Sequence, residues 1–187
     1  MKTHSISCII LAGGESKRMN GKDKGLVDFN GQPLIAHVIN ALQSQVDDFV
    51  ISANRNIEHY QQYSSNVIPD DSEKHGPLSG IAAALSACKH ERVLVIPCDM
   101  PFLPNDLVKT LIASFEHSDI AIVEVQQRFQ LVFLMNKSLL TSAQEHLTSG
   151  KHKLMQWVGD CSHTIVDFTA SADAFRNINS IQDLNNL

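Results

Sequence analysis

The chain has 187 residues, of which 43% are hydrophobic, which is enough to bury one substantial core but slightly too few for two ordinary domains. Its 20 acidic and 15 basic residues give a formal net charge of -5, which argues against binding to nucleic acid or to a membrane surface through a broad basic face. We therefore expect a single domain spanning residues 1–187, in which any anionic ligand is held by a local group of basic residues.

The cellular compartment is predicted from the signal sequence, membrane-spanning segment and disulfide pattern that the sequence does not show. The first apolar run is short and leads directly into Gly13 and Gly14, unlike a secretory signal. No stretch approaches the roughly 20 continuous apolar residues of a membrane-spanning helix. The four cysteines form no CxxC pair and have no short-range His partner, so neither a disulfide framework nor a zinc site is indicated. These features favour a reduced, cytoplasmic protein.

The predicted elements alternate between strands and helices along the chain. Apolar runs predict strands at residues 6–11, 49–53, 66–68, 92–96, 119–125 and 129–135. Apolar residues at helical spacing, each series led by a proline, predict helices at 33–45, 77–88 and 104–115, and a terminal helix is expected over 180–187. Only three residues separate the strands at 119–125 and 129–135, so a tight turn is expected there. The pattern predicts an α/β fold with a mixed sheet.

A group of glycines and basic residues follows the first predicted strand. Residues 11–26 read LAGGESKRMNGKDKGL and contain four basic and two acidic residues, a local positive excess in an acidic chain. Gly13 and Gly14 permit positive φ and close approach of a ligand to backbone N–H groups. Arg18 and Lys24 supply positive charge, so the stretch favours polyphosphate binding over the alternative of a surface loop with solvated lysines. It matches neither a Walker A loop nor a GxGxxG motif.

Polar residues also follow three other predicted strands, and ligands collect at the carboxyl ends of parallel strands. Asn54 follows the second strand, Asp70 the third and Asp99 the fourth. A lone Asp at a strand end suffices for Mg²⁺, which takes one or two carboxylates plus substrate phosphates. From the residues alone, Asp99 is equally well explained as a turn or capping residue before Pro101.

Several motifs in register resemble one family. The stretch LAGGESKRMNGKDKGL with NGQPLIAHVI, followed by SANR, VIPD, GPLSGI, PCDMPFL and FRNINS, is similar to the molybdenum cofactor guanylyltransferases, the MobA family, over nearly the whole chain. The resemblance implies the nucleotide-diphospho-sugar transferase fold: a three-layer α/β/α Rossmann-like sandwich with a mostly parallel mixed sheet. It also implies Mg²⁺-dependent transfer of GMP from GTP to molybdopterin, which forms the guanine dinucleotide cofactor and releases pyrophosphate.

Site roles are carried over by the same resemblance. The residues expected to bind the nucleotide are Leu11, Ala12, Gly13, Gly14, Lys24, Asn54, Asp70 and Asp99. Arg18, Lys24 and Asp99 are expected to be catalytic, with Asp99 as the metal ligand, and Asn177 and Asn179 to bind the acceptor. The chain departs from the family at Ser52, where an Asn is expected, and near Gln130-Leu131, where relatives often have a Pro.

Three alternatives stay open at this point. A cytidylyltransferase of molybdopterin, or another small-molecule nucleotidyltransferase of this fold, would carry a similar loop, because residue physics does not separate GTP from CTP. A nucleotide-binding regulatory module would lack the chemistry, although the residues that the chemistry needs are present. An interaction protein is the third alternative, because the family resemblance implies transient contacts with other molybdenum cofactor proteins that receive the product.

Overall fold

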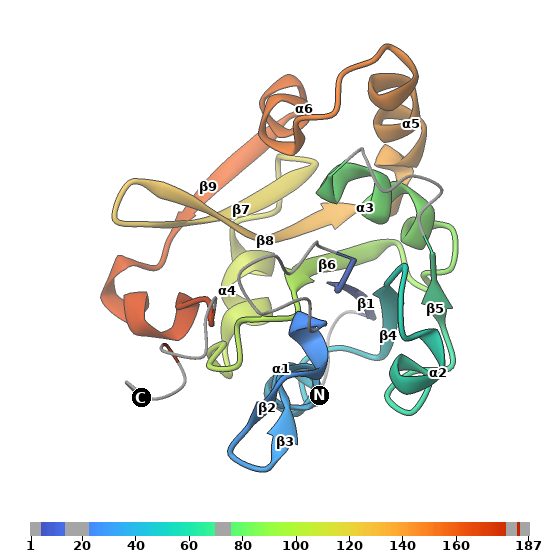
Figure 1. Cartoon of the computed structure of the whole chain (residues 1–187). Helices are drawn as coiled ribbons and strands as arrows, with labels where there is room; N and C mark the ends of the chain where they lie inside the picture. Colours follow the sequence, from blue (N-terminus) through green and yellow to red (C-terminus); the bar gives the residue numbers. More distant parts are fainter. Residues whose placement is uncertain (1–4, 14–22, 70–75, 179–182, 184–187) are drawn as a thin grey trace.

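The computed structural model of the protein describes residues 5–13, 23–69, 76–178 and 183. Within these residues the main sheet has seven strands in the order β5-β4-β1-β6-β8-β7-β9, from right to left in Figure 1. The strands are β1 (Ile6–Leu11), β4 (Asp48–Ser52), β5 (Val67–Ile68), β6 (Arg92–Pro97), β7 (Ile120–Val125), β8 (Arg128–Asn136) and β9 (His163–Asp167). The six strands predicted from the sequence are all present, each within about two residues of its expected ends.

Strand direction agrees with the prediction of a mostly parallel mixed sheet. Strands β5, β4, β1 and β6 pair in parallel, and so do β7 and β9. Only β8 runs against its two neighbours in this sheet. The central strands β1 and β6 are buried on both faces, which explains why their sequences are continuously apolar rather than alternating.

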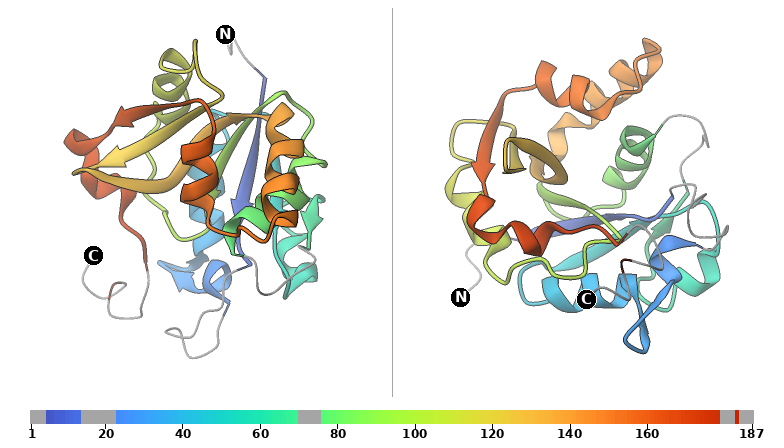
Figure 2. Two further views of the ribbon diagram at one scale, coloured as in Figure 1. Left: turned by 90° about the horizontal axis from the view of Figure 1, so that it is seen from above. Right: turned by 60° about the vertical axis from the view of Figure 1, so that its left-hand side comes forward.

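Helices cover both faces of the sheet and make three layers (Figure 2). One face carries α1 (Leu34–Leu42), α2 (Ile57–Tyr60) and α4 (Leu107–Ala113), and the other carries α3 (Pro77–Leu85), α5 (Leu140–Thr148) and α6 (Leu154–Asp160). The described part also contains a small hairpin of β2 (Asp28–Phe29) and β3 (Gln32–Pro33), and three 3-10 turns, η2 (Lys24–Leu26), η3 (Lys137–Leu139) and η4 (Thr169–Phe175). None of the described helices has the length and apolar character to cross a membrane.

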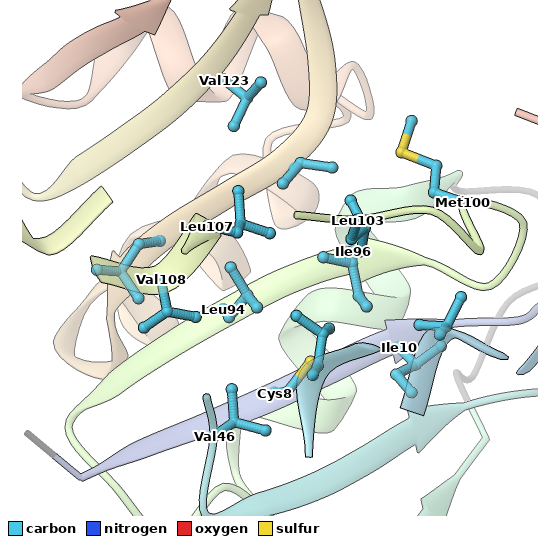
Figure 3. Packing of buried hydrophobic residues seen from close by; sticks show 14 of the residues in the cluster. Cys8, Ile10, Val46, Leu94, Ile96, Met100, Leu103, Leu107, Val108 and Val123 are labelled. Carbon is cyan, nitrogen blue, oxygen red and sulfur yellow. The ribbon is translucent and has the colours of Figure 1, made fainter. Parts of the chain in front are cut away.

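Two apolar clusters fill the space between the layers. In the first, Cys8 and Ile10 of β1 and Leu94 of β6 face Leu107 and Val108 of α4 (Figure 3). In the second, on the opposite face of the sheet, Trp157 of α6 is 1% exposed and packs with residues of α3 and the central strands. Trp157, the one tryptophan of the chain, is therefore a core residue.

The helices predicted at 33–45, 77–88 and 104–115 are present but shorter, and several elements were missed, including α2 and the β2–β3 hairpin. Helix α1 begins at Leu34, because Pro33 has extended backbone and sits in the N-cap position rather than in the first turn. Helices α5 and α6 and strand β9 were not predicted. Helix α5 buries only Ala143 and His146, and β9 is an edge strand with one buried residue, so neither has a strong apolar pattern. Most of the helix predicted over 180–187 lies outside the described residues.

The predicted turn between β7 and β8 is a two-residue loop. Gln126 has φ 49° and Gln127 has φ 61°, the left-handed pair that matches the twist of a hairpin. Ile122 pairs with Phe133 but Glu124 pairs with Phe129, so β8 contains extra residues and bulges between them. The bulge includes Gln130 and Leu131, where the sequence lacks the Pro expected from the family. The departure from the family sequence therefore coincides with the register shift between β7 and β8.

Gln127→Gly should stabilise the protein, because glycine adopts positive φ without the steric cost that a Cβ brings. We expect the free energy of unfolding in urea to rise by about 1 kcal/mol. Gln127→Ala is the matched control and should not stabilise the protein, since alanine keeps the Cβ. Equal stabilisation by both substitutions, or a loss with glycine, would show that the turn conformation is not the cause.

Candidate functional site

The candidate site lies at the carboxyl ends of β4, β1 and β6. The Cys98 N–H donates to the Leu11 carbonyl at 3.1 Å, and the Ala12 N–H donates to the Ser52 carbonyl at 2.8 Å. These bonds extend the parallel pairing beyond the ends of the strands. The loops that carry Gly13, Asn54 and Asp99 therefore leave the sheet side by side, as predicted for a ligand site in a parallel sheet.

An ion pair between Lys24 and Asp99 joins two of these loops. The Lys24 Nζ contacts Asp99 Oδ2, with the Lys24 side chain 23% exposed and the Asp99 side chain 9% exposed. Lys24 opens the 3-10 turn η2, and Asp99 lies two residues after the end of β6. Two residues that are 75 positions apart in the sequence (99 minus 24) are thus brought into direct contact, and both were selected from the sequence.

The other carboxylate oxygen of Asp99 is suited to a metal ion. Asp99 Oδ1 is buried and has no hydrogen-bond partner in the described structure, and a turn or capping role would have used it. A buried carboxylate oxygen without a partner is costly, and a cation would satisfy it. No cluster of three or more His, Cys, Asp or Glu side chains suited to a metal occurs among the described residues. One carboxylate completed by substrate phosphates matches the donor set that Mg²⁺ takes.

Gly13 lies beside Asn54 at the end of the central strands. A Cβ built on Gly13 would be 3.8 Å from Asn54 Nδ2 and 3.9 Å from the Ser52 carbonyl, both ordinary contacts. Gly13 is not one of the residues with positive φ, so it does not use the left-handed conformation that glycine permits. The described protein atoms therefore leave room for a side chain at Gly13, and close approach of a ligand remains the reason to have glycine there.

The segment that ends at Ile178 is tied to the Asp99 loop. The Ile178 N–H donates to the Asp99 carbonyl at 3.0 Å, and the Ile178 side chain is buried with Phe29 and Leu34. Asn177 is exposed and precedes this anchor directly. The structure thus brings the expected acceptor-binding Asn177 to the same edge of the sheet as Lys24 and Asp99.

Four of the residues selected from the sequence lie outside the described residues. They are Gly14, Arg18, Asp70 and Asn179. The remaining seven, namely Leu11, Ala12, Gly13, Lys24, Asn54, Asp99 and Asn177, all belong to segments that meet at the carboxyl edge.

Sequence reasoning missed a buried polar group behind Lys24. The Asp23 carboxylate accepts hydrogen bonds from the Tyr60 hydroxyl through Oδ1 and from Asn56 Nδ2 through Oδ2, the latter at 3.0 Å. Gly25 packs against the same hydroxyl, since a Cβ there would lie 2.6 Å from the Tyr60 oxygen. The sequence held one signal, the glycine directly after the Asp23-Lys24 pair, but it gave no indication of Tyr60 as a partner.

Cys98, directly before Asp99, is not a candidate nucleophile. Burial raises the pKa of the Cys98 thiol well above its usual value, and the negative charges of Asp99 and Asp23 raise it further. The thiol therefore stays protonated and serves as a buried apolar group. His37 has a packing role, because its Nε2 lies 2.7 Å from the Phe29 carbonyl oxygen and its ring contacts the Phe29 ring.

Residues 8–164 match the family described as "MobA-like NTP transferase domain". The chain belongs to this family. A molybdenum cofactor guanylyltransferase from Aliivibrio fischeri is 41% identical to this MobA-like chain over 186 residues, covering 98% of it and 96% of the relative. One of the same name from Pasteurella multocida is 40% identical, covering 97% and 98%, respectively.

Solved structures agree with this assignment at the level of the fold. Molybdopterin-guanine dinucleotide biosynthesis protein A from Archaeoglobus fulgidus superposes on this MobA-like chain with a TM-score of 0.77 at 22% identity, covering 96% of this chain and 95% of the other. A nucleotidyl transferase from Methanothermobacter has a TM-score of 0.77 at 16% identity, with 97% and 95% covered. The nucleotidyltransferase fold predicted from the sequence is confirmed.

Gly25→Ala should destabilise the protein, because the new methyl group collides with the Tyr60 hydroxyl in a packed interior. We expect a loss of roughly 1 to 3 kcal/mol in the free energy of unfolding, measured by urea denaturation.

Gly159→Ala in α6 is the control for this prediction. A Cβ at Gly159 meets no described atom within 4 Å, and alanine is the better helix former, so stability should stay the same or rise by up to about 1 kcal/mol. An unchanged stability of Gly25→Ala would contradict the close packing of Gly25 on Tyr60.

Proposed function

We propose that the protein transfers GMP from GTP to molybdopterin, forming the guanine dinucleotide form of the molybdenum cofactor and releasing pyrophosphate. The observation that carries the proposal is the Lys24–Asp99 pair at the carboxyl ends of β1 and β6, where a cation and a carboxylate suited to a metal ion meet. The relatives at about 40% identity are guanylyltransferases of this cofactor and span nearly the whole chain, which supports the choice of substrates.

The triphosphate is assigned to the loops around Lys24. Leu11, Ala12 and Gly13 offer backbone groups at the end of the central strand, and Asn54 offers a side-chain amide beside Gly13. Lys24 Nζ supplies a positive charge on the same edge. Gly14, Arg18 and Asp70 belong to the same proposal on the strength of the family resemblance alone.

The reaction needs charge stabilisation more than proton transfer. An oxygen of the terminal phosphate of the acceptor forms a bond to the α-phosphorus of GTP while the bond from that phosphorus to pyrophosphate breaks, and the leaving group takes the electron pair. The attacking oxygen is already ionised at neutral pH, so no general base is required. Lys24 is placed to stabilise the charge that grows on the leaving pyrophosphate.

Asp99 is the residue that would hold the metal ion, and we propose Mg²⁺. A bound Mg²⁺ would neutralise phosphate charge and fix the geometry of the phosphate oxygens. Asp99 itself contributes one carboxylate whose Oδ1 is buried without a partner in the described structure. The Lys24 ammonium contacts the same carboxylate through Oδ2.

The acceptor is assigned to the segment that is fixed on Asp99 by Ile178. Asn177 is exposed next to this anchor, and we assign Asn179 to the same subsite from the family motif. We further propose that residues 1–187 act as one catalytic domain in the cytoplasm, that other molybdenum cofactor proteins receive the product, and that neither nucleic acid nor membrane is a partner.

The first experiment is calorimetry of GTP, CTP, ATP and UTP, each with Mg²⁺, followed by turnover of the preferred nucleotide with molybdopterin. Preference for GTP and formation of the guanine dinucleotide only when molybdopterin is present are expected. Equal or better use of CTP would move the protein to the cytidylyl branch with the same site. Binding without turnover would favour a regulatory module and overturn the proposed activity.

Substitutions at the ion pair should separate catalysis from folding. Lys24→Ala should lower kcat/KM at least about tenfold, or roughly 1.4 kcal/mol of transition-state stabilisation. Asp99→Asn should remove most metal-dependent turnover, with a loss of about 10²-fold or more. The measurement is initial rate against GTP and Mg²⁺ concentration.

Lys109→Ala and Asp106→Asn are the matched controls, because both side chains are exposed at α4. They should leave kcat/KM within about twofold of the wild-type protein, as surface substitutions usually do. Unchanged Mg²⁺-dependent turnover in Asp99→Asn would show that the metal ligand has been assigned to the wrong residue.

Asn177→Ala should act on the acceptor and not on the nucleotide. We expect the KM for molybdopterin to rise about tenfold, as for the loss of a hydrogen bond to a charged group, with the KM for GTP unchanged. Asn40→Ala, on the exposed side of α1, is the control. A larger effect on GTP than on molybdopterin would place Asn177 on the nucleotide side of the site.

A further inference from the structure

Asp23 uses its whole carboxylate to join the Lys24 turn to helix α2. The side chain is buried, and its two oxygens accept separately from Tyr60 and Asn56. Asp23 occupies the N-cap position of η2 but makes no side-chain capping bond there. Asn56 likewise precedes α2 without capping it and has φ 52°. Two residues that ordinarily cap their own helices instead bind each other.

Gly25 makes the second contact between this turn and α2. The backbone of Gly25 lies so close to the Tyr60 hydroxyl that no side chain fits between them. The residues before and after Lys24 are thus both held by one tyrosine, one through a hydrogen bond and one through packing. The backbone that carries the lysine is fixed on both sides.

Tyr60 also belongs to the apolar cluster that holds the neighbours of Asp99. Its side chain is fully buried in the same apolar cluster as Cys98 and Met100, the two residues that flank Asp99 in the sequence. Burial raises the pKa of the Tyr60 phenol well above its usual value, so the hydroxyl remains a hydrogen-bond donor. Tyr60 therefore links the Lys24 turn to the apolar cluster that also holds the two neighbours of Asp99.

We propose that Tyr60, acting through Asp23 with the help of Asn56, is a positioning residue that orients Lys24 toward the phosphates of the nucleotide. This inference rests on the function proposed above, because Lys24 must act on a triphosphate. A lysine carries its charge at the end of a four-carbon stem, so the position of the backbone that carries it sets the region that its ammonium can reach. Small errors in the position of a catalytic group are costly in rate.

The test is a double-mutant cycle between Tyr60→Phe and Lys24→Ala. Tyr60→Phe removes the hydroxyl and keeps the ring, and we expect kcat to fall about tenfold or more. In the Lys24→Ala protein the same substitution should change kcat less than about twofold, since there is no lysine left to orient. If the loss of kcat in the double variant equals the product of the losses in the two single variants, Tyr60 acts independently of Lys24. That result would overturn the inference.

Tyr63→Phe is the matched control, because Tyr63 lies three residues further along and packs at the border of the same cluster. It should leave kcat within about twofold of the wild-type value. Asp23→Asn is the second variant, for use if Tyr60→Phe does not fold. It keeps the shape of the side chain, weakens the bond from Tyr60, and should show the same coupling to Lys24→Ala. A fall in kcat that is independent of Lys24 would count against the inference.

The same cycle in nucleotide binding separates this inference from the proposed function. Calorimetry of the preferred nucleoside triphosphate with Mg²⁺ requires no acceptor, so it reports on Lys24 even if molybdopterin is not the substrate. Weaker binding in Tyr60→Phe that disappears in the Lys24→Ala background would support positioning. The inference would be overturned if the effects of Tyr60→Phe and Lys24→Ala on nucleotide affinity multiply in the double variant. It would also be overturned if Tyr60→Phe changes neither the affinity nor kcat. Failure of the wild-type protein to use molybdopterin would overturn the proposed function alone.

Discussion

The contact between the Lys24 ammonium and the Asp99 carboxylate is the interaction around which the site is organised. It forms only because β1 and β6 are neighbours and run in the same direction, so that the loops after them leave the sheet together. A charged pair that is largely shielded from water is favourable only when each partner is well placed. Here the parallel strands fix one partner and the contacts of η2 with α2 fix the other.

The fold could be predicted because its strongest signals are local. Strands β1 and β6 are continuously apolar, α1 and α3 have helical periodicity, and the two glutamines between β7 and β8 leave room only for a turn. Elements at the border of the structure were missed for the opposite reason. Strand β9 and helix α5 each bury so little that their sequences resemble surface loops.

The site could be predicted only in part, and the reason is again physical. Lys24, Asn54 and Asp99 follow strands, and the rule that ligands gather at strand ends selects such residues without knowledge of tertiary contacts. The group behind Lys24 depends on pairs such as Asp23 and Tyr60, which are 37 positions apart. A tyrosine on a one-turn helix is an ordinary core residue in the sequence. Its polar role follows only from the tertiary structure, in which the Tyr60 hydroxyl donates a hydrogen bond to the Asp23 carboxylate.

The hydrogen bond from Ile178 to Asp99 has a consequence for the order in which the site is made. The sheet strands β5, β4, β1 and β6 all lie before residue 98, so the half of the sheet that contains the nucleotide loops can form early. Ile178, however, leaves the ribosome 79 residues after Asp99 (178 minus 99), and until then Phe29 and Leu34 lack their covering partner. A growing chain would therefore bring Lys24 and Asp99 together before Ile178 can cover Phe29 and Leu34 and join the Asp99 loop.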